Sequence, residues 1–208
     1  MAKEKEWCNE AECYLIQNWP SARLMEKAME SIRKEYKGIF ERAVDALQQS
    51  GKAFDNPGVF VTQFWGRGYV FLNRTAWMRN KKIWPPPGFY IENLRLELLC
   101  DKDEPAPYAS IWLPAKKTGV DLSEARKAIV EAAQQLLTKE ECERCLKQQE
   151  EVEYPLYYDL PEPKDQLLEM LVKGDGQSFV DCMVGHLDLL ARFTPVVDKL
   201  LGVAAGGQ

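Results

Sequence analysis

The sequence contains few of the residues from which common catalytic motifs are built. Its 208 residues include a single histidine, His186, which excludes paired-histidine metal sites and histidine relays. The chain has no glycine-rich phosphate loop and no Gly-x-Ser-x-Gly nucleophile turn, so the usual nucleotide-binding and serine-hydrolase motifs are absent. Carboxylate and tyrosine chemistry are left open. These absences favour a non-enzymatic protein, and we expect it to need no cofactor and no metal.

Long apolar segments and a dense set of cysteines are also lacking. No stretch approaches the ~20 apolar residues that a membrane-spanning helix needs. The first residues are charged and lead into no apolar run of secretory-signal length. Six cysteines are too few for a disulfide framework in a chain of this length. We therefore expect a cytoplasmic protein with reduced cysteines and no membrane partner.

One segment lacks acidic residues, although the chain as a whole carries a net charge of −5. Residues 56–91 contain five cations and no Asp or Glu, and many aromatic residues lie between the cations. Aromatic rings stack on bases or anchor protein partners, and cations neutralise phosphates or acidic surfaces. The predicted binding residues are Trp65, Arg67, Arg74, Trp77, Arg79, Lys81, Lys82 and Trp84. The predicted partner is a protein or a nucleic acid. The competing interpretation is that the rings form a sheet core and the cations form its solvated rim.

The first half of the chain predicts one long helix followed by an antiparallel meander. Apolar residues recur at helical spacing over residues 20–51. Two β-branched and aromatic runs, 58–64 and 69–74, flank a turn with two glycines and predict a hairpin. Alternation over residues 89–100 predicts a third strand, and residues 108–113 predict the returning strand. The meander as a whole covers 57–116.

The second half, residues 121–202, is predicted to be mostly helical. Asp121 and Thr138 each begin a sequence that matches the capping box at a helix start. Residues 152–160 predict a short strand, at a sheet edge because Pro155 lacks the amide that a central strand needs. Three further helices are predicted over 165–173, 178–193 and 194–202, and a disordered tail over 203–208.

Together these elements predict a single α+β domain over residues 1–208, with a mixed polar segment at 1–19. We expect a mainly antiparallel, four- to five-stranded sheet packed against the long N-terminal helix and the C-terminal helical half. Ala28, Ile32 and Ile39 of the long helix could face a second copy of the chain as readily as the sheet. A homodimer is therefore left open.

Zinc is one alternative. Cys142 and Cys145 form a Cys-x2-Cys pair. Cys182 and His186 form a Cys-x3-His pair. All four are ligands that tetrahedral zinc prefers, and each pair lies on one side of a predicted helix. However, structural Cys-x2-Cys pairs usually lie in turns, and His186 falls on an apolar stripe typical of a hydrogen-bonded core histidine. We therefore assign no zinc site from the sequence.

Two further functions compete with partner binding. Glu92, Glu97 and Asp101 are close in the sequence and would suit a metal-dependent hydrolase or nuclease. The following strand lacks the carboxylate that a restriction-type nuclease would require, so a solvated acidic turn is the simpler interpretation. The second alternative is a small-ligand-binding domain, because aromatic side chains with a few polar groups are what such pockets use.

Overall fold

The computed structural model describes residues 10–49, 58–60, 68–78, 83–146, 154–173 and 176–203. The chain divides into two compact units, Met1–Gly38 and Ile39–Gln208. The single-domain organisation stays a prediction. In the described part of the chain no helix is long and apolar enough to cross a membrane.

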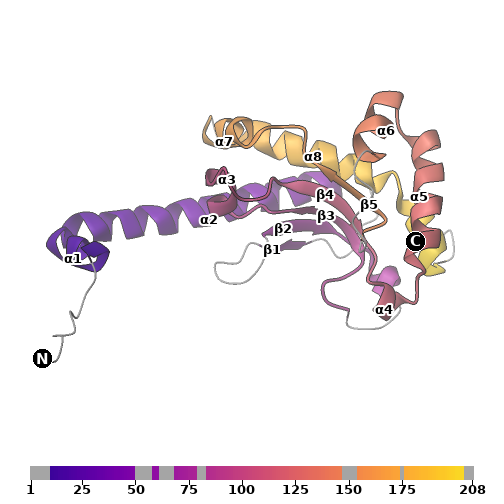
Figure 1. Cartoon of the computed structure of the whole chain (residues 1–208), viewed down its shortest axis with the longest axis horizontal. Helices are drawn as coiled ribbons and strands as arrows, with labels where there is room; N and C mark the ends of the chain where they lie inside the picture. Colours follow the sequence, from indigo (N-terminus) through magenta and orange to yellow (C-terminus); the bar gives the residue numbers. More distant parts are fainter. Residues whose placement is uncertain are drawn as a thin grey trace, which may run out of the picture. The chain divides into compact units, whose positions relative to one another are not determined.

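The first unit is helical. It contains α1 (Glu10–Gln17) and most of α2 (Trp19–Gln49), which confirms the long helix predicted over 20–51 (Figure 1). The expectation that all cysteines are reduced is wrong for Cys13, which is disulfide-bonded. The other four cysteines in the described residues are free, namely Cys100, Cys142, Cys145 and Cys182.

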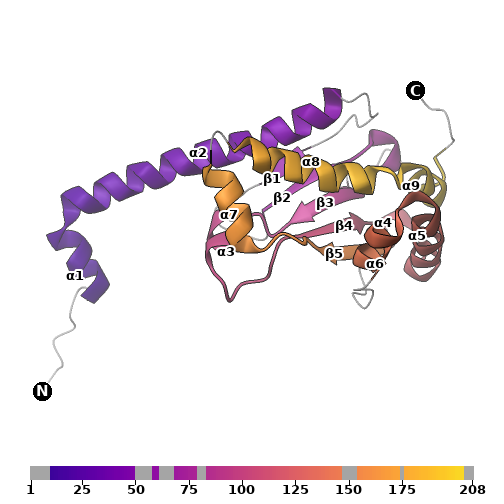
Figure 2. The same cartoon turned by 90° about the horizontal axis from the view of Figure 1, so that it is seen from above.

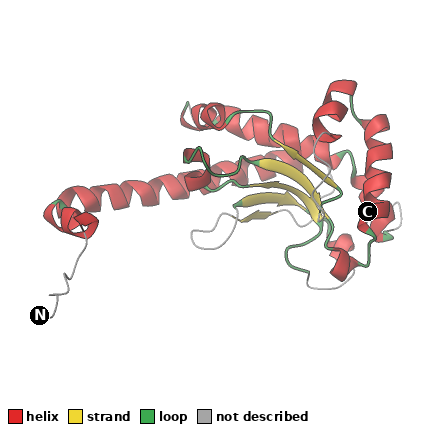
Figure 3. Cartoon of the chain, in the orientation of Figure 1, coloured by secondary structure: helices red, strands yellow, loops and turns green. Residues whose placement is uncertain are grey.

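The second unit is built on one antiparallel sheet whose spatial order follows the chain order, β1-β2-β3-β4-β5. The strands are β1 (Gly58–Phe60), β2 (Tyr69–Leu72), β3 (Gly88–Glu92), β4 (Tyr108–Trp112) and β5 (Leu156–Asp159) (Figure 3). The α+β class, the meander and the edge position of the last strand are confirmed.

The predicted strand over residues 89–100 is wrong in its second half. β3 ends at Glu92, and residues 96–100 form a short helix, α3 (Leu96–Cys100). The strand stops because Asn93 adopts a left-handed conformation with φ of 60°, which breaks the extended ladder. The alternating leucines that suggested a strand also fit a helical turn, in which Leu99 is buried and Glu97 is exposed.

The remaining helices are η1 (Thr75–Met78), α4 (Ala115–Thr118), α5 (Leu122–Leu136), α6 (Lys139–Leu146), α7 (Lys164–Val172), α8 (Gln177–Ala191) and α9 (Thr194–Leu201). Both predicted helix starts are confirmed. The Asp121 carboxylate accepts the amides of Ser123 and Glu124. The Thr138 hydroxyl and the Glu141 carboxylate each accept the other residue's amide, which is a complete capping box.

The two faces of the sheet differ in chemistry. Pairing across β2, β3, β4 and β5 places two rows of residues on one face. The first row is Val70, Ile91, Ala109 and Tyr158, and the second row is Leu72, Phe89, Ile111 and Leu156. All eight are buried, and α8 packs against β3 and β4 (Figure 2). We call this the apolar face. The other face, here the tyrosine face, carries Tyr69, Phe71, Tyr90, Glu92, Tyr108, Ser110, Trp112, Tyr157 and Asp159.

Candidate functional site

Two of the sequence-predicted binding residues meet inside the fold. Arg74 follows β2, and its Nη1 donates to both carboxylate oxygens of Asp198 on α9, at 2.8 and 2.6 Å. Trp77, on η1, donates from its Nε1 to the same carboxylate at 2.6 Å. Its ring is fully buried and meets Phe89 edge-on, with ring centroids 5.4 Å apart. Asp198 therefore holds the connection between β2 and β3 on the C-terminal helix.

Trp84 lies in a different environment, because 56% of the residue is exposed. Its ring meets Phe71 edge-on at a centroid distance of 6.3 Å. Its carbonyl oxygen accepts the ammonium of Lys117, on α4, at 2.7 Å. Phe71 in turn stacks on Tyr90, at 5.4 Å. Trp84 is thus the exposed end of a row of rings that continues over the tyrosine face.

The other five predicted residues lie outside the described residues. They are Trp65, Arg67, Arg79, Lys81 and Lys82. The structure therefore places Arg74 and Trp77 together at Asp198, and places Trp84 on the surface.

The acidic residues considered for a metal-dependent hydrolase or nuclease do not lie together in one cluster. The described part of the chain contains one group of three His, Cys, Asp or Glu side chains whose ligand atoms are close enough to share a metal. That group does not include Glu92, Glu97 or Asp101. Glu92 is buried on the tyrosine face and accepts the Ser110 hydroxyl at 3.3 Å. Glu97, whose side chain is half exposed, lies 3.6 Å from Nε of the largely buried Arg95.

The group that does assemble consists of Glu162, Cys182 and His186. Cys182 and His186 are four residues apart on α8, and so they lie on the same side of this helix. Glu162 comes from the connection after β5, between Pro161 and Pro163, whose rings restrict the backbone on both sides. A strand connection and one helix face thus bring three metal-ligand types together.

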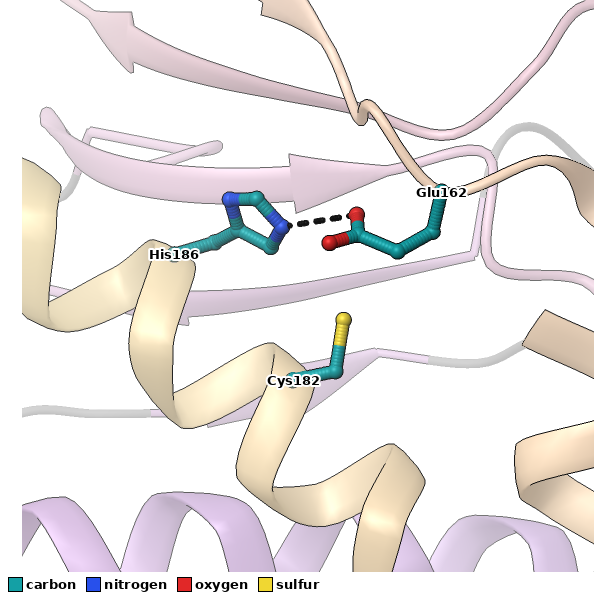
Figure 4. Close-up of side chains that lie close together, drawn as sticks. All are labelled: Glu162, Cys182 and His186. Atoms are coloured by element: carbon teal, nitrogen blue, oxygen red, sulfur yellow. Dashed lines mark hydrogen bonds and ion pairs between the residues drawn. The ribbon is translucent and has the colours of Figure 1, made fainter. Parts of the chain in front are cut away.

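The geometry of this cluster is close. The ligand atoms of the three side chains all lie within 4.8 Å of one another (Figure 4). His186 Nε2 is 3.0 Å from a Glu162 oxygen, and His186 Nδ1 is 3.3 Å from the Tyr158 hydroxyl. The His186 side chain is 7% exposed, whereas that of Glu162 is 22% exposed. The cluster is therefore set in the core with one edge toward solvent.

Burial and hydrogen bonding shift the pKa values of this cluster in opposite directions. Burial, together with the charge and the hydrogen bond of Glu162, raises the pKa of the Cys182 thiol to about 12. Burial also raises the pKa of Glu162, but the hydrogen bond and charge of His186, a backbone hydrogen bond and the charge of Arg144 together outweigh burial and hold that pKa below its usual range. A neutral thiol beside an ionised carboxylate is the result.

This arrangement does not suit a cysteine nucleophile. Such a site needs an imidazole nitrogen that accepts the thiol proton. Here Nδ1 faces Tyr158 and Nε2 faces Glu162, so both nitrogens already have a partner. The raised pKa of Cys182 keeps its thiol protonated, which also argues against a cysteine nucleophile. Metal ligation is the chemistry that the three donors share.

The zinc set considered from the sequence is only half assembled. Cys182 and His186 do come together, but Cys142 and Cys145 are not in their group. Cys145 is buried on α6, where burial raises its pKa to about 11. Sequence reasoning missed Glu162 and Tyr158. The Cys-x3-His spacing identified the pair on α8, whereas no local pattern links Glu162 to that pair.

Comparison with protein-family models, with curated proteins and with solved structures found no match to the chain.

Proposed function

We propose that the protein is a cytoplasmic, non-enzymatic binding module that engages a protein or nucleic-acid partner through the aromatic and basic surface around residues 65–84. The observation that carries the proposal is the exposure of Trp84. An indole that is 56% exposed and supported by a neighbouring ring and by Lys117 is the kind of anchor that binding surfaces use.

Charge favours single-stranded nucleic acid as the partner to test first. Lys116 and Lys117 on α4 are exposed, and Lys117 contacts the Trp84 backbone directly. The sequence adds Arg79, Lys81 and Lys82 within five residues of Trp84. Cations beside an exposed ring combine phosphate neutralisation with base stacking.

The state of the cysteines bears on the proposed cytoplasmic location. The four free cysteines fit a reducing compartment, whereas the Cys13 disulfide is an observation against it. Labelling of accessible thiols in intact cells, before and after lysis, would show where the chain resides.

The test is fluorescence anisotropy with labelled single-stranded oligonucleotides at low and high salt. Trp84→Ala is expected to weaken binding by about 10-fold or more, since base stacking contributes roughly 1–3 kcal/mol per base. Val172→Ala is the control, because Val172 is 79% exposed but lies on α7, at the end of a different helix. No binding at low salt would exclude a nucleic-acid partner and leave a protein partner. Equal binding by the wild type and Trp84→Ala would refute the assigned surface.

A homodimer is a second part of this proposal. Eight large apolar residues of the first unit are exposed, namely Tyr14, Leu15, Ile16, Trp19, Leu24, Met25, Met29 and Ile32. Exposed apolar residues in such number are typical of an interaction surface. Analytical ultracentrifugation is expected to show a concentration-dependent dimer that Met25→Glu converts to monomer. A wild-type monomer at high concentration would refute it.

The tyrosine face favours one further candidate, a small-ligand site. Glu92 and Ser110 are buried polar groups among aromatic rings, which is a common composition for ligand sites. Intrinsic fluorescence across a metabolite panel tests this candidate. A ligand response lost in Glu92→Gln but kept in Trp84→Ala would support it, and the reverse pattern would support the Trp84 surface.

A further inference from the structure

Glu162, Cys182 and His186 supply one carboxylate oxygen, one sulfur and one imidazole nitrogen within 4.8 Å of one another. Tetrahedral zinc takes these three donor types, with bonds of roughly 2.0–2.3 Å. Ligand atoms around such an ion lie roughly 3 to 4 Å apart, so only small side-chain movements separate the observed arrangement from a coordinated one. We propose that Glu162, Cys182 and His186 form a zinc site with three protein ligands.

The hydrogen-bond partner of His186 supports this assignment. A histidine that binds a metal through one ring nitrogen usually donates the proton on the other to a fixed partner. The Tyr158 hydroxyl lies 3.3 Å from His186 Nδ1, which leaves Nε2 as the metal-binding atom. Tyr158 is itself buried on β5, so the ring of His186 is oriented by the sheet.

The charges of the three ligands also suit a zinc ion. Coordination replaces the thiol proton of Cys182 with the metal, so a thiolate and a carboxylate neutralise the two positive charges of the ion. The proton is released to solvent, and zinc affinity is therefore expected to fall as the pH is lowered. Hard cations such as magnesium prefer oxygen ligands and would not select this mixed set.

Three protein ligands leave the fourth tetrahedral position for a water molecule or an external ligand. Glu162, at 22% side-chain exposure, forms the solvent side of the cluster, and His186, at 7%, forms the buried side. A small external ligand would therefore reach the ion past Glu162. Zinc sites that are purely structural are usually closed by four protein ligands, which distinguishes this site from them.

The experiment uses the untagged full-length protein, stripped of metal with a chelator and titrated with zinc against a competing indicator. Cobalt(II) serves as the spectroscopic probe, because a thiolate ligand gives a sulfur-to-cobalt charge-transfer band. We expect one zinc ion per chain. Cys182→Ser and His186→Asn are expected to lower affinity by roughly 100-fold or more, and Tyr158→Phe by about 10- to 100-fold.

The matched controls are two other free cysteines. Cys142→Ser tests the pair considered from the sequence, and Cys100→Ser tests an exposed thiol. Both are expected to bind zinc like the wild type and to keep the charge-transfer band. Glu162→Gln keeps the shape of the side chain and is expected to lose affinity for zinc. Its circular dichroism is expected to match that of the metal-free wild type, which would show that the loss comes from ligation and not from misfolding.

Three results would overturn the proposal. The first is less than one zinc ion per chain in the loaded wild type. The second is wild-type affinity in Cys182→Ser. The third is a charge-transfer band that disappears in Cys142→Ser. Trp84→Ala is expected to bind zinc normally, so failure of the zinc site and failure of the partner-binding surface give different results.

Discussion

The two faces of the sheet differ in burial and in how their polar groups are arranged. All eight residues of the apolar face are buried, whereas Tyr69, Trp112, Tyr157 and Asp159 of the tyrosine face are partly exposed. On the apolar face, polar atoms are gathered at two places, the Asp198 carboxylate and the cluster around His186. On the tyrosine face they are spread among hydroxyls and carboxylates, such as the pair Ser110 and Glu92 and the pair Tyr157 and Asp159.

This difference predicts which substitutions should lower stability most. A buried polar group is tolerable only when it has partners. On the apolar face one residue serves several partners, so its removal leaves more than one group unsatisfied. On the tyrosine face the hydrogen bonds Ser110–Glu92 and Tyr157–Asp159 each join two side chains, so we expect a single removal there to have a smaller effect.

The largest effect is expected from Phe89→Ala. Phe89 is fully buried on the apolar face against Trp77, and such truncations cost about 3–5 kcal/mol. Tyr157→Ala, at a half-buried ring of the tyrosine face, is expected to cost about 1–2 kcal/mol. Urea denaturation measures both. Equal losses would contradict the distinction between the faces.

Asp198→Ala is expected to come next, at about 2–3 kcal/mol, because it leaves both Arg74 and Trp77 without the carboxylate. The side chains of Arg74 and Asp198 are only 14% and 15% exposed, so solvent cannot replace the lost partner fully. Glu143→Ala is the control, since its ion pair with Lys139 is exposed on both sides, and it should change the free energy of unfolding by less than about 0.5 kcal/mol.

On the tyrosine face, Ser110→Ala removes one hydrogen bond to Glu92. We expect a loss of about 1 kcal/mol, measured as a shift of the urea midpoint at constant slope. A loss as large as that of Asp198→Ala would show that the polar groups of this face are coupled rather than separate.

The smallest effect is a dependence of stability on pH in the metal-free protein. The pKa of Glu162 is lower in the folded chain than its ordinary value of 4.5. Its contribution is therefore fully present above pH 4.5 and is lost as the pH falls through the folded pKa. We expect less than about 1 kcal/mol, because Glu162 is partly exposed.

Glu162→Gln should remove this acid-side loss of stability. Glu169→Gln is its control, because the pKa of Glu169 is also lowered, by Lys173, but this ion pair is exposed. Urea midpoints between pH 3 and pH 6 compare the two variants. An unchanged acid limb in Glu162→Gln would show that another group dominates there.

Much of the fold was predictable from local signals. Asp121 and Thr138 begin their helices because a short side chain satisfies free amides at that position, which spacing alone reveals. The prediction of a strand reaching Cys100 failed at Asn93, because alternating leucines fit two structures. Asn is favoured in the left-handed conformation that decides between them, but most Asn residues do not adopt it, so Asn93 alone does not mark the end of a strand.

The candidate sites were predictable only in part, for a different reason. Cys182 and His186 are neighbours on one helix, so their spacing is informative. Glu162 and Tyr158 reach them, and Asp198 reaches Arg74 and Trp77, through contacts between distant parts of the chain. No local pattern encodes such contacts.

The order of the sheet has a consequence for how the chain folds. β2, β3 and β4 pair with their nearest neighbours in the sequence, whereas β5 joins β4 only after three intervening helices, α4, α5 and α6. Short loops close at a lower entropic cost than long ones. We therefore expect the central strands to pair early and β5 to dock late, so the three proposed zinc ligands would meet near the end of folding.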